Sequence, residues 1–184
     1  MGNAALPATP TSVEALDALD AEACSAALAP LFEGAPRFLA RLVATRPFGS
    51  VEGLFEQGRL IAAAMPEDEQ IELIDAHPRL GAPPGSVSAM SYREQGYQVD
   101  AADAAAEAER SRIAAELVEL NVAYEVHFGF RYCVFVAGRP RADLIPGLQA
   151  AFEASRESEI RRALTAVIDI AADRHRTLTR EARA

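Results

Sequence analysis

Residues 156–180 read RESEIRRALTAVIDIAADRHRTLTR, which has the pattern of a long helix with one apolar face. Its apolar side chains recur every three or four residues, at Ile160, Leu164, Val167 and Ala171. That interval places them on one face of an α-helix. The same register carries Arg174 onto the apolar face. Because an unpaired buried guanidinium is costly, Arg174 is expected to meet either a nearby acid or a bound anion.

Helix starts can be read at several places upstream. Asp20 is a predicted N-cap for a helix over about 21–32, and Pro36 suits the first turn of the next helix. Ser50 can cap a third helix, whose apolar residues again lie on one face. These signals predict helices joined by short breaks.

A further short helix begins at Pro66 and delivers the chain to His77. Pro78 disfavours helical geometry at the residue before it, so the imidazole of His77 is expected at a helix exit. Residues 79–90 hold two Gly and two Pro, which predicts a loop.

Ser91 is followed by Glu94 three residues later, which is the spacing of a capping box at a helix start. A long helix is predicted over about 101–126. The next segment, 128–137, is aromatic and β-branched, and is expected to be a buried extended segment or a buried helix. Helix is expected to resume at Pro140.

The whole pattern predicts an all-α fold, a single-domain bundle of about eight helices with a buried aromatic segment at 128–137. Residues 1–10 contain Gly, Asn and two Pro and are predicted to form a flexible tail. Residues 11–184 are then one helical domain, since 184 residues suffice for one domain with a real core.

Composition excludes several classes of function. The net charge of −9, without a clustered basic face, argues against a nucleic-acid partner. No stretch approaches the roughly 18 consecutive apolar residues of a membrane span, and the N-terminus lacks a secretory pattern, so a cytoplasmic location is expected. Lys is absent, which rules out a Schiff-base lysine. Cys24 and Cys133 lie in apolar contexts and are interpreted as buried free thiols.

Each candidate residue has a local explanation beside the functional one. His77 alone is most simply a hydrogen-bonding residue at a helix end, and a capping box would account for Ser91 and Glu94 without catalysis. Arg139 can be a solvated surface residue. The three His residues are scattered through the chain, and no Cys-x-x-Cys occurs, so a metal site has little support.

The order of four short motifs supports the functional interpretation. They are Asp75-Ala76-His77-Pro78-Arg79-Leu80-Gly81, Ser91-x-x-Glu94-Gln95, Leu120-Asn121-x-x-Tyr124-x-x-x-Phe128-Gly129-Phe130 and Val136-Ala137-Gly138-Arg139-Pro140. Together they resemble the family of 2-oxo-4-hydroxy-4-carboxy-5-ureidoimidazoline (OHCU) decarboxylases, over about residues 14–178. These enzymes act in urate breakdown.

The resemblance implies an all-α homodimer and a cofactor-free decarboxylation that gives (S)-allantoin. It assigns the catalytic roles to His77 and Glu94. It assigns substrate binding to a further set: Pro78, Ser91, Gln95, Arg139 and Arg174, with Arg176 as the alternative to Arg174. No metal is implied, and urate oxidase and hydroxyisourate hydrolase would be functional partners. A helical domain that binds a small anion without turnover is the competing interpretation.

Overall fold

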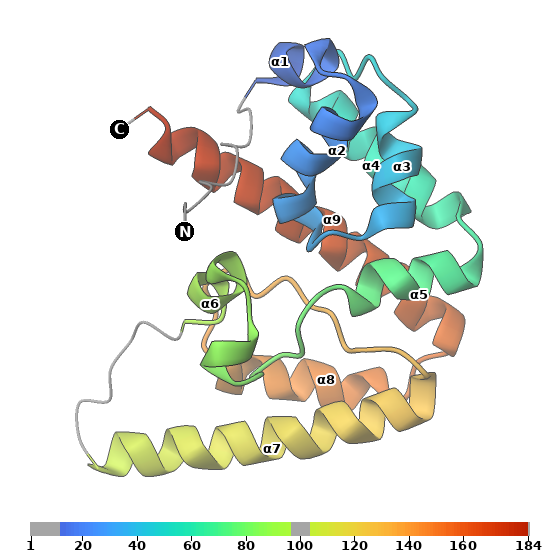
Figure 1. Cartoon of the computed structure of the whole chain (residues 1–184). Helices are drawn as coiled ribbons and strands as arrows, with labels where there is room; N and C mark the ends of the chain where they lie inside the picture. Colours follow the sequence, from blue (N-terminus) through green and yellow to red (C-terminus); the bar gives the residue numbers. More distant parts are fainter. Residues whose placement is uncertain (1–11, 97–103, 184) are drawn as a thin grey trace, which may run out of the picture. The chain divides into compact units, whose positions relative to one another are not determined.

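The computed structural model describes residues 12–96 and 104–183 (Figure 1). Within these two ranges the chain has nine α-helices and three 3₁₀-helices, and no strand. None of the helices described combines the length and apolar character that a membrane span requires. The predicted all-α fold is therefore confirmed. The predicted tail over 1–10 lies outside the described residues.

The chain divides into two compact units, which are described separately. The first contains the described residues up to Ala76 together with those from Ile168 onward, and the second contains His77–Val167. One domain over residues 11–184 stays a prediction.

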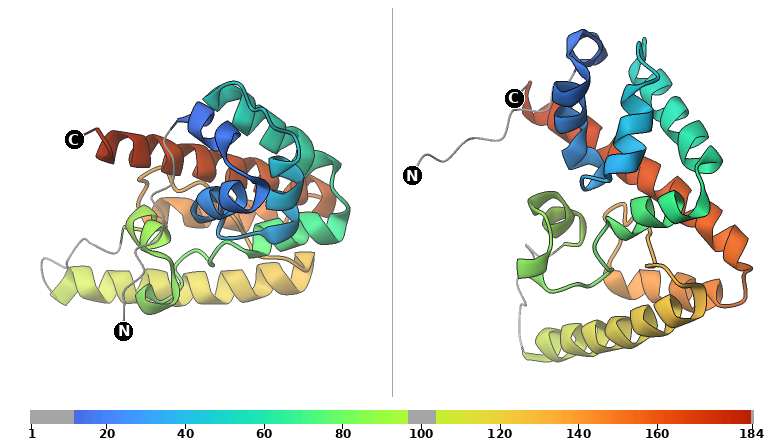
Figure 2. Two further views of the ribbon diagram at one scale, coloured as in Figure 1. Left: turned by 45° about the horizontal axis from the view of Figure 1, so that its top comes forward. Right: turned by 45° about the vertical axis from the view of Figure 1, so that its right-hand side comes forward.

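The first unit is built from five helices and the later part of a sixth. They are α1 (Val13–Ala18), α2 (Ala21–Leu28), α3 (Pro36–Val43), α4 (Val51–Ala64), α5 (Glu67–Asp75) and α9 (Arg156–Glu181), with a 3₁₀-helix at Ala29–Phe32. Helix α3 packs against α2, α4 and α5 (Figure 2). The predicted caps are confirmed: the Asp20 carboxylate accepts from the N–H of Ala23 at 2.8 Å, and Ser50 Oγ accepts from the N–H of Gly53 at 2.9 Å.

The second unit holds the other helices. They are a 3₁₀-helix at Pro84–Ser86, α6 (Ala89–Glu94), α7 (Ala104–Phe128), a 3₁₀-helix at Arg141–Leu144, α8 (Ile145–Ala151) and the first part of α9. Helices α7 and α8 pack together. The predicted start of the long helix at 101–103 lies outside the described residues. Pro140 caps a 3₁₀-helix rather than an α-helix, and α-helical geometry begins only at Ile145.

Tyr124 is the centre of the aromatic core of the second unit. Its ring lies 4.5 Å from Phe128, 5.2 Å from Tyr132 and 6.1 Å from Phe152. The phenol donates to Glu159 at 2.8 Å, and burial raises the pKa of Tyr124. The segment after Phe128 is buried at most aromatic positions, as predicted, but has neither helical nor strand hydrogen bonding over residues 131–136.

Helix α9 follows the predicted register. Its four stripe residues are all buried, and Arg174 is 2% exposed, one turn after Ala171. The burial of a guanidinium on this face was therefore predictable from the spacing of the apolar residues. Arg176, by contrast, is largely exposed and pairs with Asp173 at 3.0 Å.

Candidate functional site

His77 leaves the end of α5, as predicted. Helix α5 ends at Asp75, and the N–H of Ala76 still donates to the carbonyl of Glu72. His77 follows immediately and is 3% exposed. Pro78 prevents the helix from continuing through His77. The sequence therefore places a buried imidazole on the backbone segment where a helix becomes a loop.

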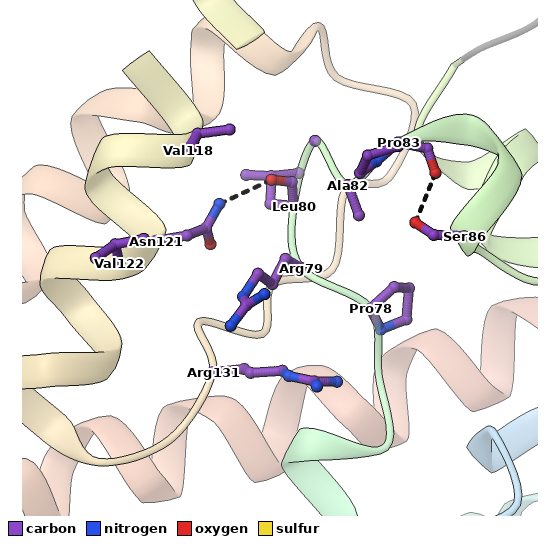
Figure 3. A pocket seen from close by; sticks show the side chains of 11 residues that line it. Pro78, Arg79, Leu80, Ala82, Pro83, Ser86, Val118, Asn121, Val122 and Arg131 are labelled. Atoms are coloured by element: carbon purple, nitrogen blue, oxygen red, sulfur yellow. Dashed lines mark hydrogen bonds between the residues drawn. The ribbon is translucent and has the colours of Figure 1, made fainter. Parts of the chain in front are cut away.

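The loop after His77 is held by side chains from three other segments of the second unit, which carry Arg131, Asn121 and Gln95. Arg131 Nη1 donates to the carbonyl of His77 at 3.2 Å. Asn121, on α7, donates to the carbonyl of Leu80 at 2.9 Å (Figure 3). The contact of Arg131 was not predicted, because it joins residues 54 positions apart in the chain.

Gln95 joins the second motif to the first. Its Oε1 accepts from the N–H of Gly81 at 2.7 Å, and its Nε2 donates to the carbonyl of Arg79 at 3.3 Å. Gln95 is itself 7% exposed, and its own carbonyl accepts from Arg141 Nε at 3.1 Å. The end of α6 and the loop after His77 are therefore fixed to each other by two hydrogen bonds.

The capping-box interpretation of Ser91 and Glu94 is wrong. Helix α6 starts three residues earlier than predicted, and Ser88 is its N-cap, with Ser88 Oγ accepting from the N–H of Ser91 at 3.2 Å. Ser88 and Ser91 are equally good capping residues, so local sequence did not decide between them. Ser91 lies inside the helix at 2% exposure, and Glu94 is the last helical residue.

Arg79 of the first motif makes an ion pair with α7. Its guanidinium donates to both carboxylate oxygens of Glu125, at 2.5 and 2.6 Å. These hydrogen bonds lower the pKa of Glu125. Glu125 lies one helical turn after Asn121, so α7 holds the loop at two successive positions on one face.

The two predicted anchoring arginines make contacts of different kinds. Arg139 is exposed, and its guanidinium donates to the carbonyls of Val136 and Phe135. Arg174 belongs to the first unit. It donates to the carbonyl of Pro30 at 3.1 Å and pairs with Glu33 at 2.8 Å. The acid that the sequence left open as a partner of Arg174 is therefore Glu33.

A cavity of about 340 Å³ lies beside the loop, within the second unit (Figure 3). Pro78 is the one predicted site residue among those that line it. Among the residues that the structure describes, no group of three or more His, Cys, Asp or Glu side chains is placed to hold a metal ion.

Known proteins resemble this chain over most of its length. The sequence profile of the OHCU decarboxylase family matches residues 17–176. The uric acid degradation bifunctional protein PucL of Bacillus subtilis (strain 168) is 30% identical over 160 residues, which are 87% of this chain and 31% of PucL. The uric acid degradation bifunctional protein of Bacillus sp. (strain TB-90) is 23% identical over 154 residues, covering 84% and 29% of the two chains. The chain thus spans about a third of the length of these relatives.

Two solved structures share the fold. A crystal structure of OHCU decarboxylase in the presence of (S)-allantoin superposes with a TM-score of 0.61 at 21% identity, over 79% of this chain and 92% of that one. A structure of (S)-allantoin synthase gives a TM-score of 0.65 at 20% identity, over 92% and 54%. The family profile covers most of the sequence, including all four motifs. The chain therefore belongs to the OHCU decarboxylase family.

Proposed function

We propose that the protein decarboxylates 2-oxo-4-hydroxy-4-carboxy-5-ureidoimidazoline to (S)-allantoin without a cofactor. The observation that carries this proposal is the pair of hydrogen bonds from Gln95 to Gly81 and Arg79. These bonds tie the segment that bears Glu94 to the segment that bears His77. His77 in the first motif and Ser91 in the second are buried polar residues, and neither caps a helix. Such residues support a site for a polar ligand.

The proposed decarboxylation requires an acid and a base at fixed positions beside the substrate. Breaking the bond between the ring carbon and its carboxylate releases carbon dioxide. The electron pair forms a C=C bond with the neighbouring carbon, and the ring imine nitrogen takes a proton. The resulting enol then becomes a ketone: its hydroxyl proton leaves, and one proton adds to the neighbouring carbon. The face that receives this last proton sets the handedness of allantoin.

His77 and Glu94 are proposed to move these protons. Imidazole changes charge near neutral pH, and a carboxylate beside it would favour the protonated form. Proton transfer by positioned groups is typically worth about 10²–10⁴-fold in rate. Pro78, Ser91 and Gln95 are proposed to contact the substrate beside this pair.

Arg139 and Arg174 are proposed to bind the polar ends of the substrate. A guanidinium matches a carboxylate or a ureido carbonyl. Carboxylate binding that is too strong would stabilise the ground state and slow its loss, so at least one arginine is assigned to the ureido end. Glu33 would hold the Arg174 guanidinium in a fixed orientation.

The protein is proposed to act as a cytoplasmic homodimer, and light scattering would then give twice the 19.7 kDa of one chain. Urate oxidase and hydroxyisourate hydrolase are proposed to supply the substrate. Disappearance of the substrate's ultraviolet absorbance, faster than in a protein-free control, tests the activity. A domain that only binds an anion would gain thermal stability from urate-like ligands but leave this decay unchanged.

A further inference from the structure

Helix α7 runs along one side of the second unit (Figure 1), and part of its surface is apolar and exposed. Among the residues that the structure describes, the exposed large apolar side chains are Leu60 on α4 and three valines on α7, Val118, Val122 and Val126. The valines are 59%, 55% and 84% exposed. Each follows the one before it by four residues, so they lie along one side of the helix. Exposed apolar residues that gather in one place, rather than singly, indicate a contact surface.

The apolar stripe continues toward the start of α7 as small uncharged residues. Ala108, Ser111 and Ala115 precede Val118 and Val122, and all five are exposed. The steps between them are three, four, three and four residues. This alternation is the spacing of the core positions of a coiled coil, in which one helix packs along another. We call these five residues the α7 seam.

The seam is separate from the face of α7 that packs inside its own unit. Leu117, Tyr124 and Phe128 are buried on that face, and α7 packs against α8. Within the described part of the chain the seam is left exposed. A surface helix needs only one apolar face to pack on its own domain. A second apolar face on α7 therefore fits a second packing partner.

The sizes of the seam residues favour a second copy of this chain as that partner. The small residues lie in the first part of the seam and the valines in the last. When two copies pair in opposite directions, Ala115 faces Val118 of the other copy, and Ser111 faces its Val122. A small residue then meets a large one at each level, which fills the space between the helices evenly. Pairing in the same direction would place valines together at one end and leave a gap at the other.

The charges beside the seam fit the same antiparallel pairing. Arg112 and Glu119 are exposed and lie seven residues apart, so they share one flank of the seam. Antiparallel pairing brings Arg112 of one copy near Glu119 of the other, and a twofold axis repeats this contact. Arg112 also pairs with Glu109 and Glu116 of its own helix. Exposed ion pairs add little affinity, so these charges favour the direction of pairing while the valines supply the affinity.

We infer that α7 forms the interface of a homodimer, in which the seams of two copies pack antiparallel around a twofold axis. This inference rests on the homodimer proposed above and assigns its interface. It does not depend on the proposed decarboxylation. A contact made by one pair of helices is smaller than most permanent dimer interfaces, so the dimer is expected to dissociate on dilution.

Sedimentation velocity of the full chain over a range of concentrations measures the dissociation constant of the dimer. Val122→Glu should raise this constant about a hundredfold, because each copy then places a carboxylate in the apolar contact. Ala123→Glu is the matched control and should leave the constant unchanged, since Ala123 is the next residue, is exposed and lies outside the seam. A wild-type chain that stays monomeric at every concentration would refute the homodimer itself. A dimer that both variants leave equally stable would keep the homodimer and refute the α7 interface.

Cysteine cross-linking tests the direction of pairing. Ser111→Cys and Val122→Cys are oxidised separately and as a mixture. Antiparallel pairing places position 111 against position 122 of the other copy, so the mixture should form a disulfide-linked dimer. Neither variant alone should do so, because its two new thiols would lie about 16 Å apart along the helices. The natural Cys24 and Cys133 are buried and should not link the copies. Linkage in either variant alone, or none in the mixture, would overturn the inference.

Discussion

Gln95 holds the backbone on which His77 lies: its side-chain amide accepts from the N–H of Gly81 and donates to the carbonyl of Arg79. The Gln95 side chain therefore holds the loop backbone at two points, Arg79 and Gly81. Gln95 directly follows Glu94, the carboxylate proposed to take part in catalysis. Its two hydrogen bonds therefore oppose movement of the loop that bears His77 relative to the end of α6 that bears Glu94.

Gln95→Ala should lower both stability and turnover. Removing the amide takes this partner from the Gly81 N–H and the Arg79 carbonyl, at two part-buried hydrogen bonds. Each loss should therefore cost less than the roughly 1–3 kcal/mol of a fully buried group. Urea unfolding measures the first effect and the decay of substrate absorbance measures the second. Gln149→Ala on α8, where the side chain is exposed, is the control. Unchanged turnover in Gln95→Ala would separate this residue from the reaction.

His77→Asn should reduce turnover by about 10²–10⁴-fold while the protein stays folded, because an amide cannot transfer the proton. Helical circular dichroism and the melting temperature check the fold. His127→Asn is the control, since His127 is exposed on α7. A His77→Asn variant that keeps most of its activity would remove the catalytic role from this residue.

Ser88→Ala should mainly lower stability, whereas Ser91→Ala should mainly lower turnover. Ser88 caps α6, so its loss should cost about 1 kcal/mol of stability and leave the chemistry largely intact. Ser91 is buried within the helix and does not cap it, so its loss should lower turnover more than stability. Parallel unfolding and rate measurements on both variants check this. Equal loss of rate in the two would mean that only the helix matters.

Arg174→Ala should raise the KM. Because the side chain is buried against Glu33, truncation also breaks this ion pair, and breaking a buried pair can cost about 3–5 kcal/mol. Glu33→Gln weakens the ion pair but keeps the guanidinium, so it should shift the melting temperature with little change in KM. If both variants lose stability and neither changes KM, Arg174 is a purely structural residue.

The ion pair between Arg79 and Glu125 should make stability depend on acid pH. The folded-state pKa of Glu125 is lowered by the hydrogen bonds from Arg79. Its contribution is therefore present above the unfolded-state pKa, near the usual value for glutamate, and is lost as the pH falls through the lower folded-state value. Glu125→Gln should flatten this part of the stability curve, whereas Glu119→Gln, at an exposed position on the same helix, should not. Denaturant melts at a series of acid pH values measure the difference.

Local rules predicted much of the helical framework. Asp20 and Ser50 cap helices as expected, and the register of α9 correctly buries Arg174. Each of these predictions depends on residues within one or two helical turns. The start of α6 was misplaced for the same reason, since Ser88 and Ser91 offer the same local chemistry.

The contacts that hold the loop were beyond local rules. Gln95 meets residues 14 and 16 positions away, and Arg131 meets a carbonyl 54 positions away. Nothing in the spacing of these residues fixes which carbonyl each will reach. The candidate residues for catalysis came from the resemblance of the motifs. The contacts that hold the loop beside them, from the end of α6 and from α7, came only from the structure.

Circular dichroism of allantoin formation, with the substrate generated from urate by urate oxidase and hydroxyisourate hydrolase, measures whether the proposed decarboxylation occurs and which hand of allantoin it gives. Because the substrate decays spontaneously to racemic allantoin, a mixture without this protein is the reference. The proposed decarboxylation requires a rapid signal of one hand, that of (S)-allantoin. The surface variant Val126→Glu should retain this signal, and His77→Asn should lose it. A trace that matches the protein-free reference at every protein concentration would contradict the proposed decarboxylation.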